Sequence, residues 1–239
     1  MTDNSQVRSA ELDISVLVMA YNEVGNLEPV VRELVDELDH LGQPWELAIV
    51  DDGSTDGTAP LADTLAADIP GVRVLHHETN QGLGGVYRTG FAAARGRYVT
   101  FFPADGEFPA TIVGQFLPLM DDADMVLGYL NEPDISLLSR MLAWGERVLY
   151  RLLFGSLPRF QGVLMFRRSL LNTLPLTSTG RAWTVLMELI LRTHRAGYRM
   201  LSVPTELRPR MSGESKVNNV RTVVDSFRQL FVLRRTLSP

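Results

Sequence analysis

The sequence contains no cysteine, a single lysine and no long uncharged apolar run. Without cysteine, the chain can form neither a disulfide framework nor a thiolate metal site, and a reducing compartment such as the cytoplasm is compatible with its composition. Because a helix needs roughly 20 consecutive apolar residues to cross a bilayer, we expect any membrane attachment to be peripheral or made through a partner. Residues 1–12 are polar and mixed in charge, which predicts a disordered leader without a secretion signal.

The 239 residues are 45% hydrophobic and 21% charged, which favours one large α/β catalytic domain with a substantial core. The formal net charge of −5 hides a strong asymmetry, because residues 1–134 carry −17 and the remainder carries +12. We expect the basic carboxyl-terminal part to meet phosphates on a nucleotide, a lipid or a membrane surface. Nucleic acid is not an expected partner, since no recognised nucleic-acid module or basic-aromatic pattern accompanies the charge.

Strand-like and helix-like segments alternate through the first half of the chain, a pattern that predicts a Rossmann-like, mainly parallel central sheet flanked by helices. The expected strands are Ile14–Met19, Glu46–Val50, Val72–His76 and Tyr98–Phe102, separated by helices at Asn26–Leu41, Thr58–Ala67 and Gly85–Ala94. Farther along, we expect a helix from Pro109 to about Met120, strands at Met125–Leu127, Val163–Phe166 and Met200–Val203, and a helix at Thr184–Ala196.

Two further amphipathic helices are expected in the carboxyl-terminal half, at Ile135–Phe154 and within residues 217–239, the second following a domain that spans residues 13–216. Both combine an apolar face with a stripe of arginines. Such a helix packs equally well on its own domain or on a membrane surface, and both interpretations stay open. We expect the protein to be cytoplasmic and peripheral at the inner face of the membrane.

Polar clusters follow three of the predicted strands directly. They are Ala20-Tyr21-Asn22-Glu23, then Asp51-Asp52-Gly53-Ser54 with Asp56-Gly57-Thr58, and then Asp105-Gly106-Glu107. Since parallel strands end at one edge of a sheet, we expect these side chains to gather there and to offer hydrogen-bond acceptors to a ribose or a base. Asp, Ser and Thr are also ordinary helix-capping residues, so a well-capped loop is the competing interpretation.

Together with Asn80-Gln81-Gly82-Leu83-Gly84 and the segment Arg210 to Lys216, these motifs resemble family 2 glycosyltransferases of the GT-A fold. Within that family the chain is similar to the polyprenyl-phosphate sugar transferases typified by dolichyl-phosphate mannosyltransferase. The resemblance implies an inverting, metal-dependent enzyme. It would move a hexose, mannose or glucose, from a nucleoside diphosphate sugar to a polyprenyl or dolichyl phosphate.

The resemblance also implies roles for individual residues. Ala20, Tyr21, Glu23, Asp51 and Asp52 would contact the nucleoside of the donor. Asp105 and Glu107 would bind Mg²⁺ or Mn²⁺, for which carboxylate oxygens are suitable ligands, and Asp105 would also contact the nucleotide sugar. Arg210, Ser215 and Lys216 would contact the acceptor phosphate, and Asp105, Arg210 and Lys216 would be catalytic. Lys216 is the only lysine of the chain.

The chain departs from the family pattern at three places. Pro103 stands where the family has the first Asp of its Asp-X-Asp motif, and Glu107 is the carboxylate available to replace the lost charge. Gly128-Tyr129 lacks the family's following Ser-Arg, and Phe160–Val163 replaces its Thr-Ser-Gly-like acceptor loop. Two alternatives therefore stay open. In the first, the enzyme transfers the sugar to a saccharide or another hydroxyl acceptor. In the second, the protein is a pseudo-enzyme that binds a nucleotide sugar without transferring it.

A hydroxyl acceptor would require a general base, for which Glu188 is a candidate, although an ion pair with Arg192 one helical turn away is the favoured interpretation. An NAD site is not expected, because Tyr87 occupies the third glycine position of the Gly-X-Gly-X-X-Gly pattern. The four histidines lack metal-ligand spacing, and we expect them to be structural or exposed.

Overall fold

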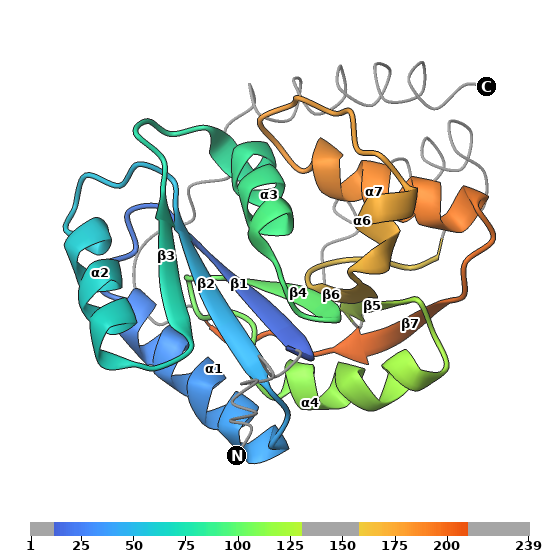
Figure 1. The fold of residues 1–239 in the computed structure, drawn as a ribbon, viewed down its shortest axis with the longest axis horizontal. Helices are drawn as coiled ribbons and strands as arrows, with labels where there is room; N and C mark the ends of the chain where they lie inside the picture. Colours follow the sequence, from blue (N-terminus) through green and yellow to red (C-terminus); the bar gives the residue numbers. More distant parts are fainter. Residues whose placement is uncertain (1–11, 131–157, 210–239) are drawn as a thin grey trace, which may run out of the picture.

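The computed structural model describes residues 12–130 and 158–209 as a central sheet flanked by helices (Figure 1). The strands are β1 (Ile14–Ala20), β2 (Trp45–Asp51), β3 (Val72–His76), β4 (Tyr98–Pro103), β5 (Met125–Leu130), β6 (Leu164–Arg167) and β7 (Met200–Thr205). The helices are α1 (Leu27–Leu41), α2 (Thr58–Asp68), α3 (Gly82–Ala93), α4 (Ile112–Phe116), α6 (Ser169–Thr173) and α7 (Thr184–Arg195), with a 3₁₀ helix η1 (Leu117–Asp121).

The strand order is β3-β2-β1-β4-β6-β5-β7. Only β6 runs antiparallel to its neighbours β4 and β5, and the other pairings in this sheet are parallel. The expectation of a Rossmann-like, mainly parallel sheet is therefore confirmed. The carboxyl ends of the six parallel strands and the amino end of β6 lie at one edge of the sheet, which we call the carboxyl edge.

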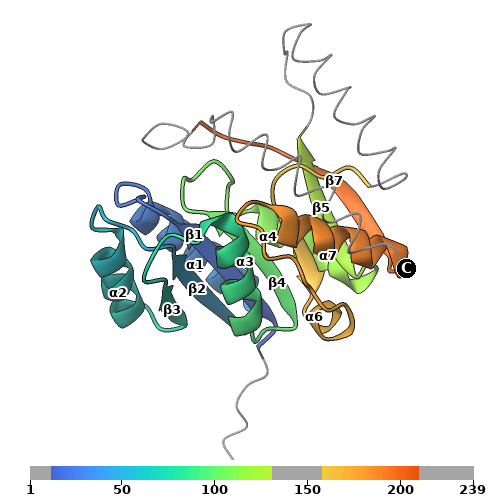
Figure 2. The ribbon, with the colours of Figure 1, turned by 90° about the horizontal axis from the view of Figure 1, so that it is seen from above.

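The sheet forms because its strands are continuous apolar runs that are covered on both faces. All seven residues of β1 are buried, as are six of the seven residues of β2. Such runs are typical of parallel strands with helices on both sides. Figures 1 and 2 show helices on both faces of the sheet, with α1 packed against α2 and α4 and with α3 packed against α7.

Helix α1 shows how the pattern sets the packing. Its buried side chains recur at the helical period, with Leu27, Val30, Val31, Leu34 and Leu38 forming one stripe toward the core. The helix ends where Gly42 adopts a left-handed conformation, with φ of 64°.

The structure corrects the expected elements at two places. The single helix expected from Pro109 to about Met120 is divided into α4 and η1, because Pro118 lies in the first turn of η1 and cannot continue an α-helical hydrogen-bond ladder. Helix α6 was not expected at all. The helix expected at Ile135–Phe154 and the carboxyl-terminal helix of residues 217–239 lie outside the described residues. Within the described parts, none of the helices has the length and apolar character needed to span a membrane.

Candidate active site

Backbone hydrogen bonds tie the strand ends together at the carboxyl edge. The amide of Asp52 donates to the carbonyl of Ala20 at 2.9 Å, and the amide of Ala104 donates to the carbonyl of Met19 at 2.9 Å. Farther along the edge, the amide of His77 donates to the carbonyl of Asp51 at 2.9 Å. The motifs after β1, β2 and β4 are therefore brought side by side, as their positions after parallel strands predict.

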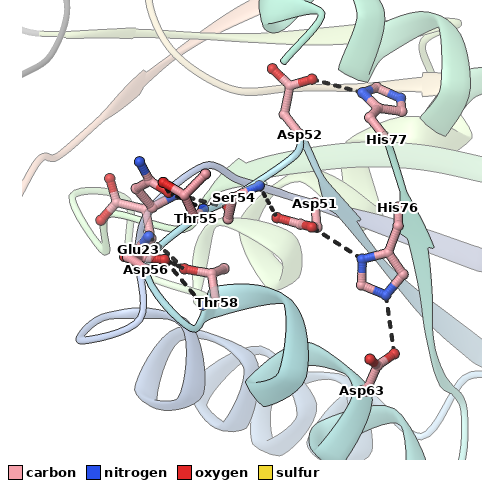
Figure 3. A network of polar contacts seen from close by, with 11 residues as sticks. Glu23, Asp51, Asp52, Ser54, Thr55, Asp56, Thr58, Asp63, His76 and His77 are labelled. Carbon is pink, nitrogen blue, oxygen red and sulfur yellow. Dashed lines mark hydrogen bonds and ion pairs between the residues drawn. The ribbon is translucent and has the colours of Figure 1, made fainter. Parts of the chain in front are cut away.

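The loop after β1 is fastened to the loop after β2 by side-chain hydrogen bonds (Figure 3). Asn22, the one non-glycine residue with positive φ in the described chain, donates its amide to Ser54 Oγ at 2.9 Å and accepts the Thr55 amide at 2.7 Å. The amide of Glu23 donates to Thr58 Oγ1 at 2.9 Å. These contacts hold the Tyr21–Glu23 segment over the end of the sheet.

Asp56 organises the same loop. Its Oδ1 accepts the Thr58 amide at 3.1 Å, and its Oδ2 accepts the Val24 amide at 3.3 Å. Burial alone would raise the pKa of this carboxyl, but the hydrogen bonds from Thr58 and Val24 outweigh burial and lower it. Gly57 occupies the cap position of α2 without a side-chain cap hydrogen bond, so Asp56 and Thr58 stabilise the loop but do not cap the helix.

Asp51 and Asp52 are both buried, and each is paired with a histidine (Figure 3). Asp51 accepts the Ser54 amide at 3.2 Å and lies 3.0 Å from His76 Nδ1. His76 Nε2 lies 3.0 Å from Asp63, and hydrogen bonds to the two carboxylates raise the pKa of His76 above its usual value. This histidine is structural, as expected.

Asp52 holds the start of α3. Its carboxylate accepts the amides of Gln81 at 2.7 Å and of Gly82 at 2.8 Å, and it lies 2.7 Å from His77 Nδ1. His77 in turn reaches Thr89 Oγ1 at 2.8 Å. Because Asp52 binds the first amides of the helix, α3 begins at Gly82, three residues before its expected start. Both carboxylates thus shape the loops of the edge, and their contact with a nucleoside stays a prediction.

The other expected nucleoside contacts differ in exposure. Ala20 is buried at the end of β1, so only its backbone borders the edge. Tyr21 is 37% exposed and is one of the few large apolar side chains at the surface of the described chain. Glu23 accepts a hydrogen bond from Asn26 Nδ2 at 2.7 Å. Of these residues, Tyr21 is the one that carries an aromatic ring.

The segment after β4 carries the expected metal ligands in a tight turn. Asp105 is 8% exposed, and its Oδ1 accepts the Glu107 amide at 3.1 Å across Gly106, whose φ is 75°. No group of three or more His, Asp or Glu side chains suited to a metal occurs among the described residues. Mg²⁺ is commonly held by one or two carboxylates together with substrate phosphates, so the donor set of this turn fits a cation that arrives with a diphosphate.

Pro103 ends β4 without disturbing the sheet. The amides of Tyr98 and Ala104 donate toward β1, so the amide position of residue 103 faces β6. The pairing of β4 with β6 ends at Thr100, three residues earlier, and no ladder hydrogen bond is lost at Pro103. The departure from the family motif is therefore compatible with the fold.

Arg159 is a residue of this edge whose place the sequence patterns do not indicate. It precedes β6, and its guanidinium carbon lies 5.6 Å from the ring centre of Tyr129 in β5. Gly128 has no room for a side chain, because an added Cβ would lie 2.9 Å from the Val163 carbonyl oxygen. An arginine thus stands beside the position where the sequence lacks the family's Ser-Arg.

Glu188 is fully buried and bound from several sides. It accepts the amides of Thr177 at 3.0 Å and Ser178 at 2.7 Å, and it pairs with Arg192 at 2.7 Å. Burial alone would raise its pKa, but the bonds from Ser178 and Arg192 outweigh burial and hold the pKa below its usual value. The expected ion pair is confirmed, and the alternative of a general base is not supported. Arg210, Ser215 and Lys216 lie outside the described residues.

Comparison with known proteins places this architecture in a family. Residues 15–174 match the model of glycosyl transferase family 2. The chain is 30% identical to an undecaprenyl-phosphate mannosyltransferase of Micrococcus luteus over 216 residues, which cover 86% of this chain and 87% of that protein. It is also 30% identical to a polyprenol monophosphomannose synthase of Mycolicibacterium smegmatis, over 92% of this chain and 86% of that one.

Solved structures confirm the expected GT-A fold. Glucosyl-3-phosphoglycerate synthase of Mycobacterium tuberculosis in complex with UDP superposes with a TM-score of 0.69 at 20% identity, over 95% of this chain and 81% of that chain. The complex of the same enzyme with Mn²⁺, UDP and glucosyl-3-phosphoglycerate gives a TM-score of 0.62 at 20% identity, over 95% of this chain and 77% of that one. From the family match and these relatives, the chain belongs to glycosyl transferase family 2 and is a glycosyltransferase.

Proposed function

We propose that this glycosyltransferase moves a hexose from a nucleoside diphosphate sugar to a polyprenyl phosphate. The observation that carries the proposal is the 30% identity, over most of both chains, to two enzymes named for polyprenyl-phosphate mannose transfer. The gathering of Tyr21, Asp52 and Asp105 at one edge of the sheet supports it. Mannose is the sugar favoured by these relatives, with glucose as the next candidate.

The donor would lie across the carboxyl edge. Tyr21 would contact the base, while Asp51, Asp52 and Glu23 would border the nucleoside through the loops that they hold. Asp105 and Glu107 would bind Mg²⁺ or Mn²⁺, which would neutralise the charge of the departing diphosphate. Arg210 and Lys216 would add positive charge beside the phosphates.

The acceptor would supply its own nucleophile. A phosphate monoester has a second pKa of about 6, so it is largely dianionic at neutral pH and needs no protein base. One of its oxygens would attack the anomeric carbon as the bond from that carbon to the diphosphate oxygen breaks, with inversion. A glycosyl phosphodiester and a nucleoside diphosphate result, and no proton need be transferred.

We assign Arg159 to the acceptor side of this reaction. Its position over Tyr129 places a guanidinium at the carboxyl edge, where the sequence offers no arginine after Gly128. A guanidinium binds phosphate through paired N–H groups. Because the acceptor is a lipid, we also propose that the protein works at the cytoplasmic face of a membrane as a peripheral protein.

The test is to incubate the protein with a panel of GDP- and UDP-sugars and polyprenyl phosphate in detergent, with Mg²⁺ or Mn²⁺ and then with chelator. Lipid-linked sugar is followed by mass spectrometry, and unphosphorylated polyprenol serves as the matched acceptor control. We expect a metal-dependent product with the phosphate only. A product with polyprenol or a saccharide would favour a hydroxyl acceptor. Nucleotide-sugar binding without turnover on any acceptor would favour the pseudo-enzyme.

A further inference from the structure

The segment after β7 is fixed to the turn that carries Asp105 and Glu107. The amide of Arg208 donates to the carbonyl of Glu107 at 2.9 Å, and its Nε donates to the carbonyl of Gly106 at 2.6 Å. One residue thus binds two successive carbonyls of the turn, although about a hundred residues separate them in the chain.

Glu33 of α1 completes the attachment. Its carboxylate forms a two-pronged ion pair with Arg208, in which Nη1 donates to Oε1 at 3.0 Å and Nη2 to Oε2. Oε1 of Glu33 also accepts the amide of Ala110 at 3.1 Å. The turn is therefore held at Gly106 and Glu107 by Arg208, and at Ala110 by Glu33.

Only an arginine fits this arrangement. The planar guanidinium donates from Nε to the turn and from both Nη atoms to one carboxylate, whereas a lysine ammonium is a compact donor without this fork. Gly106 adopts a φ of 75°, and a glycine backbone can reach many other conformations because it has no Cβ atom. Fixing both carbonyls that follow Asp105 removes these alternatives before any ligand binds.

We propose that Arg208 and Glu33 are a positioning pair that presets the Asp105–Glu107 turn to receive the cation of the metal–diphosphate complex. The inference rests on the proposed donor site and extends it to two residues that need not touch the donor. Partners that orient metal ligands commonly change metal affinity by about 10–100-fold when they are replaced. Arg208 also lies two residues before Arg210 in the chain, so the same segment leads into the expected phosphate motif.

An ion pair between Arg208 and Glu33 that served stability alone would respond to substitution differently from a positioning pair. The side chains of Arg208 and Glu33 are 31% and 30% exposed, so breaking the pair should cost modest stability. If that were its only role, Arg208→Lys would lower the melting temperature slightly and leave metal binding unchanged. A positioning role instead predicts a loss of metal affinity larger than the loss of stability explains.

The experiment compares wild type, Arg208→Lys, Glu33→Gln and the double variant. Arg32→Lys is the matched control, because Arg32 pairs with Glu28 on the exposed side of the same helix. Binding of Mn²⁺ in the presence of GDP or UDP is followed by the electron paramagnetic resonance signal of the free ion. Hydrogen exchange of the peptide that covers residues 103–110 reports on the turn without any ligand.

We expect each single variant to weaken Mn²⁺ binding about tenfold and to speed exchange in the turn, with the double variant no worse than the singles. Metal-free nucleotide affinity should not change, and the control should match wild type. Wild-type Mn²⁺ affinity in both single variants would overturn the inference while leaving the proposed function standing. Absence of Mn²⁺ and nucleotide binding in wild type would overturn the proposed donor site and this inference with it. If Arg208→Lys fails to fold, Glu33→Gln decides the question.

Discussion

Glu46 is a buried carboxylate at the start of β2, at the opposite edge of the sheet from the active site. It is 1% exposed and accepts hydrogen bonds from Ser15 Oγ at 2.6 Å, from Arg73 Nε at 3.0 Å, and from the Arg95 amide at 2.8 Å and Nε at 2.7 Å. Burial opposes its ionisation, but these bonds outweigh burial and lower its pKa from 4.5 to about 2. Glu46 should therefore support stability without taking part in ligand binding.

The sign and size of its contribution follow from linkage. Because the pKa is lower in the folded state, the unfolded chain takes up the proton first, and the stabilisation is lost as the pH falls from about 4.5 toward about 2. The difference between these pKa values corresponds to about 3 kcal/mol at neutral pH. Glu46→Gln should remove most of this free energy. Arg95 remains hydrated in that variant, since its side chain is 62% exposed.

The assay is chemical denaturation of wild type and Glu46→Gln at a series of pH values between 7 and 2.5. Other carboxyl groups titrate in the same range, so the measured quantity is the difference in unfolding free energy between the two proteins. We expect that difference to be about 3 kcal/mol at pH 7 and to shrink steadily below about pH 4.5. A difference that stays constant with pH would refute the reasoning, and loss of nucleotide binding in the folded variant would refute the separation of the two edges.

Four further outcomes follow from the active site. Asp105→Ala should lower the rate of sugar transfer by about 100-fold or more and abolish Mn²⁺-dependent nucleotide binding. Retained activity in this variant would show that Asp105 is not a metal ligand. Gly84→Ala should lower the free energy of unfolding by about 1–3 kcal/mol, measured by thermal denaturation. The added Cβ would lie 1.8 Å from the carbonyl oxygen of Gly180, in the loop before α7. Arg159→Ala should raise the KM for polyprenyl phosphate about tenfold with the donor KM unchanged, and an unchanged acceptor KM would exclude it from the acceptor site. Asp52→Asn and His77→Gln should weaken nucleotide binding to similar extents if Asp52 acts by holding α3, whereas a much larger loss in Asp52→Asn would indicate direct contact.

The strands could be predicted from the sequence because each is a short apolar run that ends in turn residues. The expected range at Val72–His76 coincides with β3, and the expected start of β1 at Ile14 is also correct. The reversed direction of β6 could not be predicted, since a four-residue strand carries no directional signal. α6 is a five-residue helix, too short for its periodicity to be recognised.

The gathering of the motifs at one edge was predictable from parallel-strand geometry alone, but the partners of their side chains were not. Asp52 and His77 are 25 positions apart, and Glu33 and Arg208 are 175 apart. Such pairs depend on the register of the sheet and on where the final strand ends. The sequence therefore predicted that these carboxylates lie at one edge of the sheet, but it did not indicate that Asp51 and Asp52 hold loops in place.

The state of Glu188 bears on the class of acceptor. A hydroxyl acceptor must lose a proton as it attacks, so an enzyme that uses one needs a carboxylate or histidine that can accept it. Glu188 is fully buried, is bound by two backbone amides and Arg192, and has a lowered pKa, so it is a poor proton acceptor. Its bonds instead hold Thr177 and Ser178, in a loop whose Arg181 carbonyl accepts the Gly84 amide at 2.9 Å. Glu188 thus supports the loop that contacts the start of α3, and the carboxylate that the sequence suggested as a base for a hydroxyl acceptor has a structural role instead.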